Sequence, residues 1–321
     1  MDLEARRRRR EAARRRTRRQ RRLAVAVTAG ALAAGIAGLA LATVGSDDTV
    51  GETEPAPPPP PELPRGGRKV FPEHTVVAFY GAPQTAELGA LGVGTPAAAG
   101  RRLERQARPY RHAGRPVLPA FELIATIVHS APGDDGDHSE RQTPRTIRRY
   151  LRAARARRAL LILDVQPGRA PFMREVRAFR RFLEEPDVSL ALDPEWSLAA
   201  GQLPGQQIGS TDAATVNRVS RYLSRIVRAG DLPQKLLVVH RFTQDMIRDD
   251  DRLERHPGVA LTVNVDGFGD RPNKVSKYRE FTRGQRDRHH GFKLFYEEDT
   301  NLMAPRQVLR LQPRPELVVY E

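Results

Sequence analysis

The residues best suited to chemistry lie in the segment 190–196, LALDPEW, where an apolar run ends in two carboxylates. Asp193 and Glu195 are two residues apart, and the only tryptophan of the chain, Trp196, follows them. In an extended strand such residues point to the same side, roughly 6–7 Å apart. Because neighbouring carboxylates raise each other's pKa, one of the pair can serve as a proton donor.

Similar apolar runs recur eight times after residue 68, and each is expected to form a strand. They are Thr75–Tyr80, Pro116–Leu123, Ala159–Asp164, Val188–Asp193, Lys235–His240, Val259–Asp266, Phe292–Glu298 and Glu316–Tyr320. Arginine-rich amphipathic stretches between the runs are expected to form helices, several starting with Pro, Asp or Thr. They are Pro96–Ala113, Pro144–Arg158, Pro171–Glu184, Asp212–Ala229, Thr243–Arg255, Lys274–Arg288 and Pro305–Leu311.

This alternation predicts an α/β fold, a (β/α)8 TIM-type barrel, because eight such units in about 250 residues match its size. A doubly wound open sheet is the alternative. Such a sheet more often has fewer strands and a GxGxxG turn after the first strand, which YGAPQTAELGALGVG (residues 80–94) does not supply. No helix is expected after the eighth strand, so the last helix is either missing or formed by residues before Thr75.

Polar side chains occur where nearly every expected strand ends, and in a barrel these ends share one face. Adjacent acids there repel unless a cation, protons or a ligand offsets the charge. We therefore expect an acidic mouth. Its catalytic candidates are Asp193, Glu195, Glu297 and Glu298, and its substrate-binding candidates are Tyr80, Glu122, Asp164, Gln166, Trp196, His240, Asn264 and Asp266.

Acids at the ends of strands four and seven resemble the barrel glycoside hydrolases that carry their acid/base and nucleophile there. The resemblance implies Glu195 as acid/base and Glu297 or Glu298 as nucleophile, although Pro194 stands where that family usually has Asn. LALDPEW is also similar to the acidic strand-four edge of chitinase-like barrels, without their longer run of spaced aspartates. More broadly, residues 69–321 resemble uncharacterised exported barrel proteins of high-GC Gram-positive bacteria.

Other chemistries lack their usual residues. The chain has no cysteine, no HxH or HExxH zinc spacing and no GxSxG nucleophile turn. No cofactor is therefore predicted. The alternative is a divalent cation held in the acidic mouth by Asp164, Asp193, Glu195 and Asp266.

The N-terminal region predicts a membrane anchor. Residues 1–22 carry twelve arginines against three acids and are expected in the cytoplasm, and residues 23–44 contain no charge. A helix of that length crosses a bilayer core of roughly 30 Å. A cleavable signal peptide is the alternative, with Ala40–Ala42 as a small-residue cleavage pattern. Both place the main domain outside the cytoplasm.

Residues 45–68 are acidic and then proline-rich, with five consecutive prolines, and predict a disordered, semi-rigid stalk before a barrel domain at residues 69–321. Residues 69–321 carry a net charge of +9, which suits anionic wall polymers or lipid head groups. Without aromatic residues interleaved among the basic ones, nucleic acid is not an expected partner. The sequence favours a membrane-tethered hydrolase of cell-envelope carbohydrate. The alternative is a non-catalytic barrel that binds a wall polymer or a partner protein.

Overall fold

The structure is a computed structural model that describes residues 59–111, 115–285 and 288–321. The expected cytoplasmic segment, membrane span and most of the stalk lie outside these residues. In the described part, no helix has both the length and the apolar character needed to cross a membrane.

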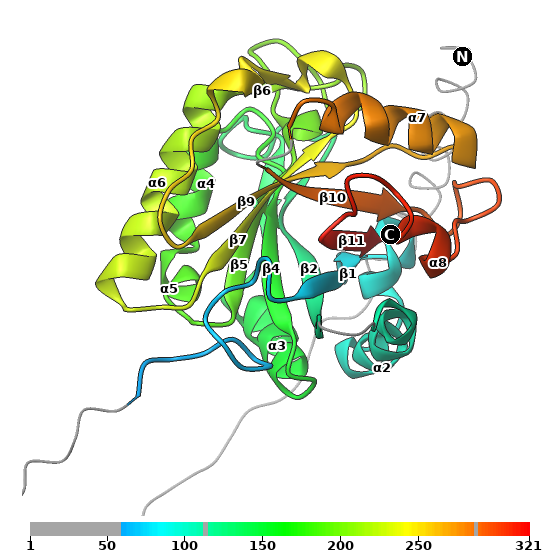
Figure 1. The fold of residues 1–321 in the computed structure, drawn as a ribbon. Helices are drawn as coiled ribbons and strands as arrows, with labels where there is room; N and C mark the ends of the chain where they lie inside the picture. Colours follow the sequence, from blue (N-terminus) through cyan, green and yellow to red (C-terminus); the bar gives the residue numbers. More distant parts are fainter. Residues whose placement is uncertain (1–58, 112–114, 286–287) are drawn as a thin grey trace, which may run out of the picture. The chain divides into compact units, whose positions relative to one another are not determined.

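Eight parallel strands form a closed barrel (Figure 1). In their order around the barrel they are β1 (Thr75–Gly81), β2 (Val117–Val128), β4 (Leu160–Val165), β5 (Val188–Leu192), β7 (Lys235–Arg241), β9 (Val259–Val265), β10 (His289–Leu294) and β11 (Leu317–Tyr320). Closure comes from β1, which pairs in parallel with both β2 and β11. The eight-stranded parallel barrel expected from the sequence is confirmed.

Three further strands lie outside the barrel wall. β3 (Ser139–Arg141) pairs antiparallel with the extension of β2, whereas β6 (Thr211–Asp212) and β8 (Ile247–Arg248) pair only with each other.

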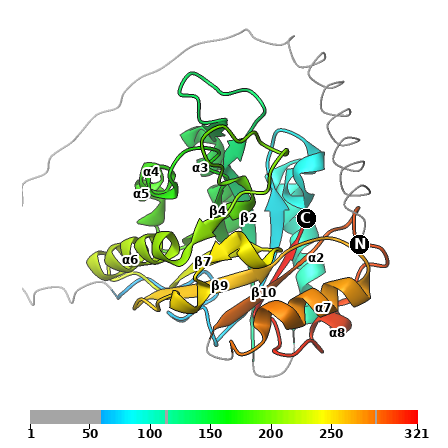
Figure 2. The ribbon, with the colours of Figure 1, turned by 90° about the horizontal axis from the view of Figure 1, so that it is seen from above.

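Helices on the outside cover the barrel, as Figure 2 shows from above. They are α2 (Pro96–Ala107), α3 (Pro144–Arg155), α4 (Phe172–Ala178), α5 (Arg180–Leu183), α6 (Ala213–Ala229), α7 (Arg271–Thr282) and α8 (Pro305–Val308). The four long helices begin at side-chain caps, Thr95, Thr143, Asp212 and Asp270, each accepting a hydrogen bond from a backbone N–H of the first turn. Short 3-10 turns are η1 (Ala86–Leu88), η2 (Ala90–Gly92), η3 (Arg108–Tyr110), η4 (Pro194–Trp196), η5 (Gln244–Met246) and η6 (Asp250–Arg252).

The helix expected over Thr243–Arg255 does not form, and that prediction was wrong. The segment instead consists of η5, β8 and η6. The buried Arg241 guanidinium donates to the carbonyls of Thr243 and Gln244 and pairs with Asp250. These contacts hold the backbone in a loop that an α-helix would not permit.

The sequence leaves open whether a last helix is missing or formed before Thr75, and among the described residues 59–74 the structure has no helix. These residues instead close the amino end of the barrel. Leu63, Val70 and Phe71 are buried and belong to the apolar cluster inside the barrel. Arg68 pairs with Asp231 at 2.7 Å. The compact unit therefore starts at Pro59, earlier than the predicted boundary at residue 69.

Side chains alternate along each strand between the barrel interior and the helical layer. On β1, Val76 and Ala78 face the interior cluster, whereas Val77 and Phe79 pack with the outer one. This period of two decides which residues near each strand end point into the barrel.

Candidate functional site

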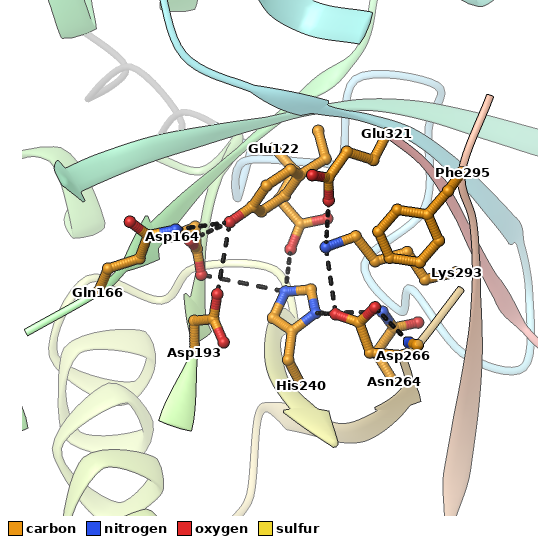
Figure 3. A network of polar contacts seen from close by, with 12 residues as sticks. Glu122, Asp164, Gln166, Asp193, His240, Asn264, Asp266, Lys293, Phe295 and Glu321 are labelled. Atoms are coloured by element: carbon orange, nitrogen blue, oxygen red, sulfur yellow. Dashed lines mark hydrogen bonds and ion pairs between the residues drawn. The ribbon is translucent and has the colours of Figure 1, made fainter. Parts of the chain in front are cut away.

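Eight polar side chains, one from each strand, form a ring at the carboxyl end of the barrel, and most of them are labelled in Figure 3. All of them continue the inward-facing alternation of their strand. In barrel order they are Tyr80, Glu122, Asp164, Asp193, His240, Asp266, Lys293 and Glu321. Asp193, Asp266 and Glu321 directly follow their strands.

Positive and negative charges alternate over one half of this ring. His240 Nδ1 lies 3.2 Å from Asp266 Oδ2, and Lys293 Nζ lies 3.1 Å from the same oxygen. Lys293 Nζ also contacts Glu321 Oε2 at 2.7 Å. The Lys293 ammonium lies 3.8 Å from the centre of the Tyr80 ring, a cation–π contact. This half is electrostatically balanced.

The other half carries three acids on adjacent strands, Glu122, Asp164 and Asp193. The Tyr80 hydroxyl lies 3.1 Å from Asp164 Oδ2 and 3.5 Å from Asp193 Oδ2, so the phenol joins the two aspartates. Gln166 Nε2 donates to the same hydroxyl at 3.0 Å. Glu122 Oε1 contacts His240 Nε2 at 3.0 Å. Negative charge is therefore concentrated at β2, β4 and β5.

Protons offset this excess. Burial, the largest influence, raises the pKa of Asp164 to about 7, while the charge of His240 opposes the rise and that of Glu122 adds to it. Burial and then the charges of Asp164 and Glu195 raise the pKa of Asp193 well above its ordinary value, although His240 opposes the rise. These influences favour the neutral form of Asp193, and Asp164, with a pKa of about 7, is partly protonated at pH 7.

Neighbouring carboxylates favour the charged forms of the two basic groups, His240 and Lys293. Burial opposes the charge on His240, but Glu122 and Asp266 outweigh it and raise the pKa of the imidazole well above its ordinary value. Burial likewise opposes the charge on Lys293, and Asp266 and Glu321 raise its pKa. An ammonium held in this way stabilises negative charge, and it lacks the free electron pair that a nucleophilic amine needs.

Space for this packing comes partly from a glycine. Gly291 of β10 lies opposite Asn264 of β9, and a Cβ atom on Gly291 would lie 2.3 Å from Asn264 Oδ1. The missing side chain lets Asn264 point inward, where its amide nitrogen lies 3.3 Å from His240 Nδ1.

The residues after Asp193 form the rim of the site. The turn η4 carries Glu195 and Trp196, which are both partly exposed. The Gly209 N–H donates to the Glu195 carbonyl at 2.7 Å and so ties the loop that leads to β6 back onto this turn. Asp193 and Glu195 therefore have different surroundings, the first buried and the second partly exposed.

The structure does not bring Glu297 and Glu298 into the polar ring. β10 ends at Leu294, whereas the sequence predicts a strand as far as Glu298, so both glutamates lie on an exposed loop. Partial desolvation and then the charge of Glu321 raise the pKa of Glu298 above its ordinary value. The next residue, Asp299, pairs with Lys274 at 3.0 Å and fixes the loop.

The substrate-binding candidates converge on the interior, apart from Trp196 on the rim. The interior residues that sequence reasoning missed are Lys293 and Glu321. The alternation of inward and outward side chains along β10 places Lys293 inside the barrel. The same alternation along β11 places Glu321 inside, one residue after the apolar run ends.

The sequence matches no protein-family model. It also matches no curated protein. Among solved structures, the chain is similar to the wild-type sialic acid aldolase of Ruminococcus gnavus. The match has 10% sequence identity and a TM-score of 0.39, and it covers 77% of this chain and 67% of that one.

Proposed function

We propose that this protein is a hydrolase of cell-envelope carbohydrate, with Asp193 as proton donor and Glu195 as the second carboxyl group. The observation that carries the proposal is the position of Asp193. Its carboxyl group contacts the buried Tyr80 hydroxyl, and Glu195 follows it on the open rim.

The two carboxyl groups suit this reaction because glycoside hydrolysis needs one protonated and one ionised acid. Burial and then the charge of Asp164 raise the pKa of Asp193 and so favour the protonated carboxyl that can donate to the oxygen of the leaving group. Glu195 is partly exposed, so water can reach its carboxylate, which can activate that water or stabilise positive charge on the sugar. Trp196 offers an apolar ring face against which a sugar can stack.

The location is part of the proposal. Residues 23–44 would anchor the chain with its N-terminus in the cytoplasm, and the stalk would hold the barrel on the outer side of the membrane. The arginine block before residue 23 supports this orientation, because short flanks rich in arginine are retained in the cytoplasm. Cell-envelope polysaccharide is then the carbohydrate within reach.

The test is release of reducing ends from peptidoglycan glycan strands and other wall polysaccharides by the full chain. We expect Asp193→Asn and Glu195→Gln each to lower kcat by roughly 100-fold or more. Glu140→Gln, which changes an exposed carboxylate on β3, is the matched control and should retain wild-type turnover. Full turnover in both Asp193→Asn and Glu195→Gln would refute the assignment.

Glu297→Gln and Glu298→Gln discriminate between two pairings. A strand-seven nucleophile predicts that one of these variants is inactive. The Asp193–Glu195 pair predicts that both keep near wild-type turnover, since both glutamates are exposed outside the polar ring.

A second candidate is a barrel that binds a wall polymer or a partner protein without cleaving it. The burial of Glu122, Asp164 and His240 favours this function, because side chains with no exposed surface do not contact a polymer at the mouth. Saturable binding of a wall polysaccharide, with no product after days and no effect of Asp193→Asn on affinity, would favour this function over hydrolysis.

A further inference from the structure

We propose that Glu122, Asp164 and His240 form a binding site for a divalent transition-metal ion. One donor atom from each residue lies within 4.8 Å of the others. His240 Nε2 is 3.0 Å from Glu122 Oε1 and 4.0 Å from Asp164 Oδ1. With metal–ligand bonds of about 2.0–2.2 Å, tetrahedral ligands lie roughly 3.4 Å apart, so small side-chain shifts suffice.

Two oxygens in this cluster support a cation as the missing partner. Glu122 Oε2 and Asp164 Oδ1 are buried and have no hydrogen-bond partner, although both residues have no exposed surface. An unsatisfied buried acceptor costs about 1–3 kcal/mol, and more when it is charged. A divalent ion would satisfy both oxygens and neutralise the half of the ring that carries three adjacent acids.

The surroundings of His240 are those of a metal ligand. Its other ring nitrogen, Nδ1, lies 3.2 Å from Asp266 Oδ2, which fixes the Nδ1 proton and leaves Nε2 directed at the two acids. Asp266 is itself held by Lys293 and by the Gly267 N–H at 2.6 Å. Such carboxylate–histidine pairs orient the imidazole and increase its basicity in metal sites.

The donor set indicates the class of ion. An imidazole nitrogen suits Zn²⁺ and its neighbours in the transition series, whereas Ca²⁺ takes oxygen ligands alone. Three protein ligands leave a fourth position for water or substrate. This inference uses no step of the proposed hydrolysis, and neither Asp193 nor Glu195 belongs to the ligand set.

The test is isothermal titration of the chelator-treated full chain with Zn²⁺ alone. We expect one ion per chain, with binding at least tenfold weaker in Glu122→Gln and in Asp164→Asn. Asp266→Asn should weaken binding by about 10- to 100-fold because it replaces the charged partner of Nδ1 with a neutral amide. Glu140→Gln should bind as the wild type does.

A second measurement needs no variant and covers the case in which substitutions prevent folding. Zn²⁺ binds the folded chain in preference to the unfolded one, so it should raise the Tm of the chelator-treated wild type as its concentration rises. Ca²⁺ should give a smaller rise, because one of the three ligands is an imidazole nitrogen. No binding to the folded wild type, no rise in Tm with Zn²⁺, or equal affinity in all folded variants would overturn the proposal.

Discussion

Asp164 and His240 show how one barrel interior treats acids and bases differently. Both are fully buried, yet the neighbours of His240 are carboxylates that favour its charge, whereas Asp164 lies between two other acids. Desolvation therefore decides the state of Asp164 and charge pairing decides that of His240. The number of protons held in the ring follows from which residues are adjacent around the barrel.

Replacing Asp164 with Asn should stabilise the metal-free protein at alkaline pH. The folded-state pKa of Asp164 is about 7, above the ordinary value of about 4, so the folded chain holds the extra proton between these values. Stability from this group is complete below pH 4, falls as pH rises to 7 and stays reduced above it. The amide cannot ionise, and it keeps an oxygen for the Tyr80 hydroxyl.

Thermal unfolding in chelator at pH 8 and pH 4 measures the effect. We expect Tm to rise at pH 8 by about 2–4 °C for each kcal/mol gained, with little change at pH 4. An equal shift at both pH values would indicate a packing effect unrelated to ionisation.

Elements were easier to predict than their ends. Eight apolar runs sufficed for the barrel because each strand is buried on both faces. Most members of the polar ring could be predicted because they lie at strand ends. Lys293 could not, since a lysine within an apolar run is taken for an exposed residue unless the alternation of side chains along the strand is counted. The sequence placed Glu297 and Glu298 on a strand, but β10 ends at Leu294 and both lie on the loop that follows. The ion pair of Asp299 with Lys274 holds this loop. Such side-chain ties between distant residues leave no local pattern in the sequence.

Replacing Gly291 with Ala should disturb the contact between β9 and β10. The new methyl group would lie 2.3 Å from Asn264 Oδ1, and the fully buried Asn264 has nowhere to move. We expect a loss of about 1–3 kcal/mol in unfolding free energy from denaturant titration. Gly230→Ala is the control, because its Cβ would meet only the flexible Leu232 side chain, at 3.1 Å. Equal losses in the two variants would mean that Asn264 is not tightly confined.

On the scale of the whole molecule, the two ends of the barrel have opposite character. The mouth carries the acids, whereas the amino end has a cavity of about 760 Å³ whose lining includes Arg65, Arg111, Arg115, Arg157 and Arg158. Residues 59–68 pack at this basic end, through Leu63 and the ion pair of Arg68. The chain therefore enters the barrel on the side away from the site.

The proposed topology predicts different protease sensitivity for the two parts of the chain. In cells that make the full protein with tags at both ends, protease added outside spheroplasts should remove the C-terminal tag and spare the N-terminal one. The reason is the arginine-rich flank, which holds residues 1–22 on the cytoplasmic side. Protection of both tags in intact spheroplasts, with digestion after lysis, would contradict an external barrel.

The single tryptophan gives the molecule an optical probe at the mouth. Trp196 is partly exposed and stands three residues from Asp193, so all indole fluorescence originates beside the proposed proton donor. A sugar that stacks on the ring would remove water from it and shift its emission to shorter wavelength. Occupancy of the mouth can thus be followed in real time by light, without a label and before any bond is cleaved.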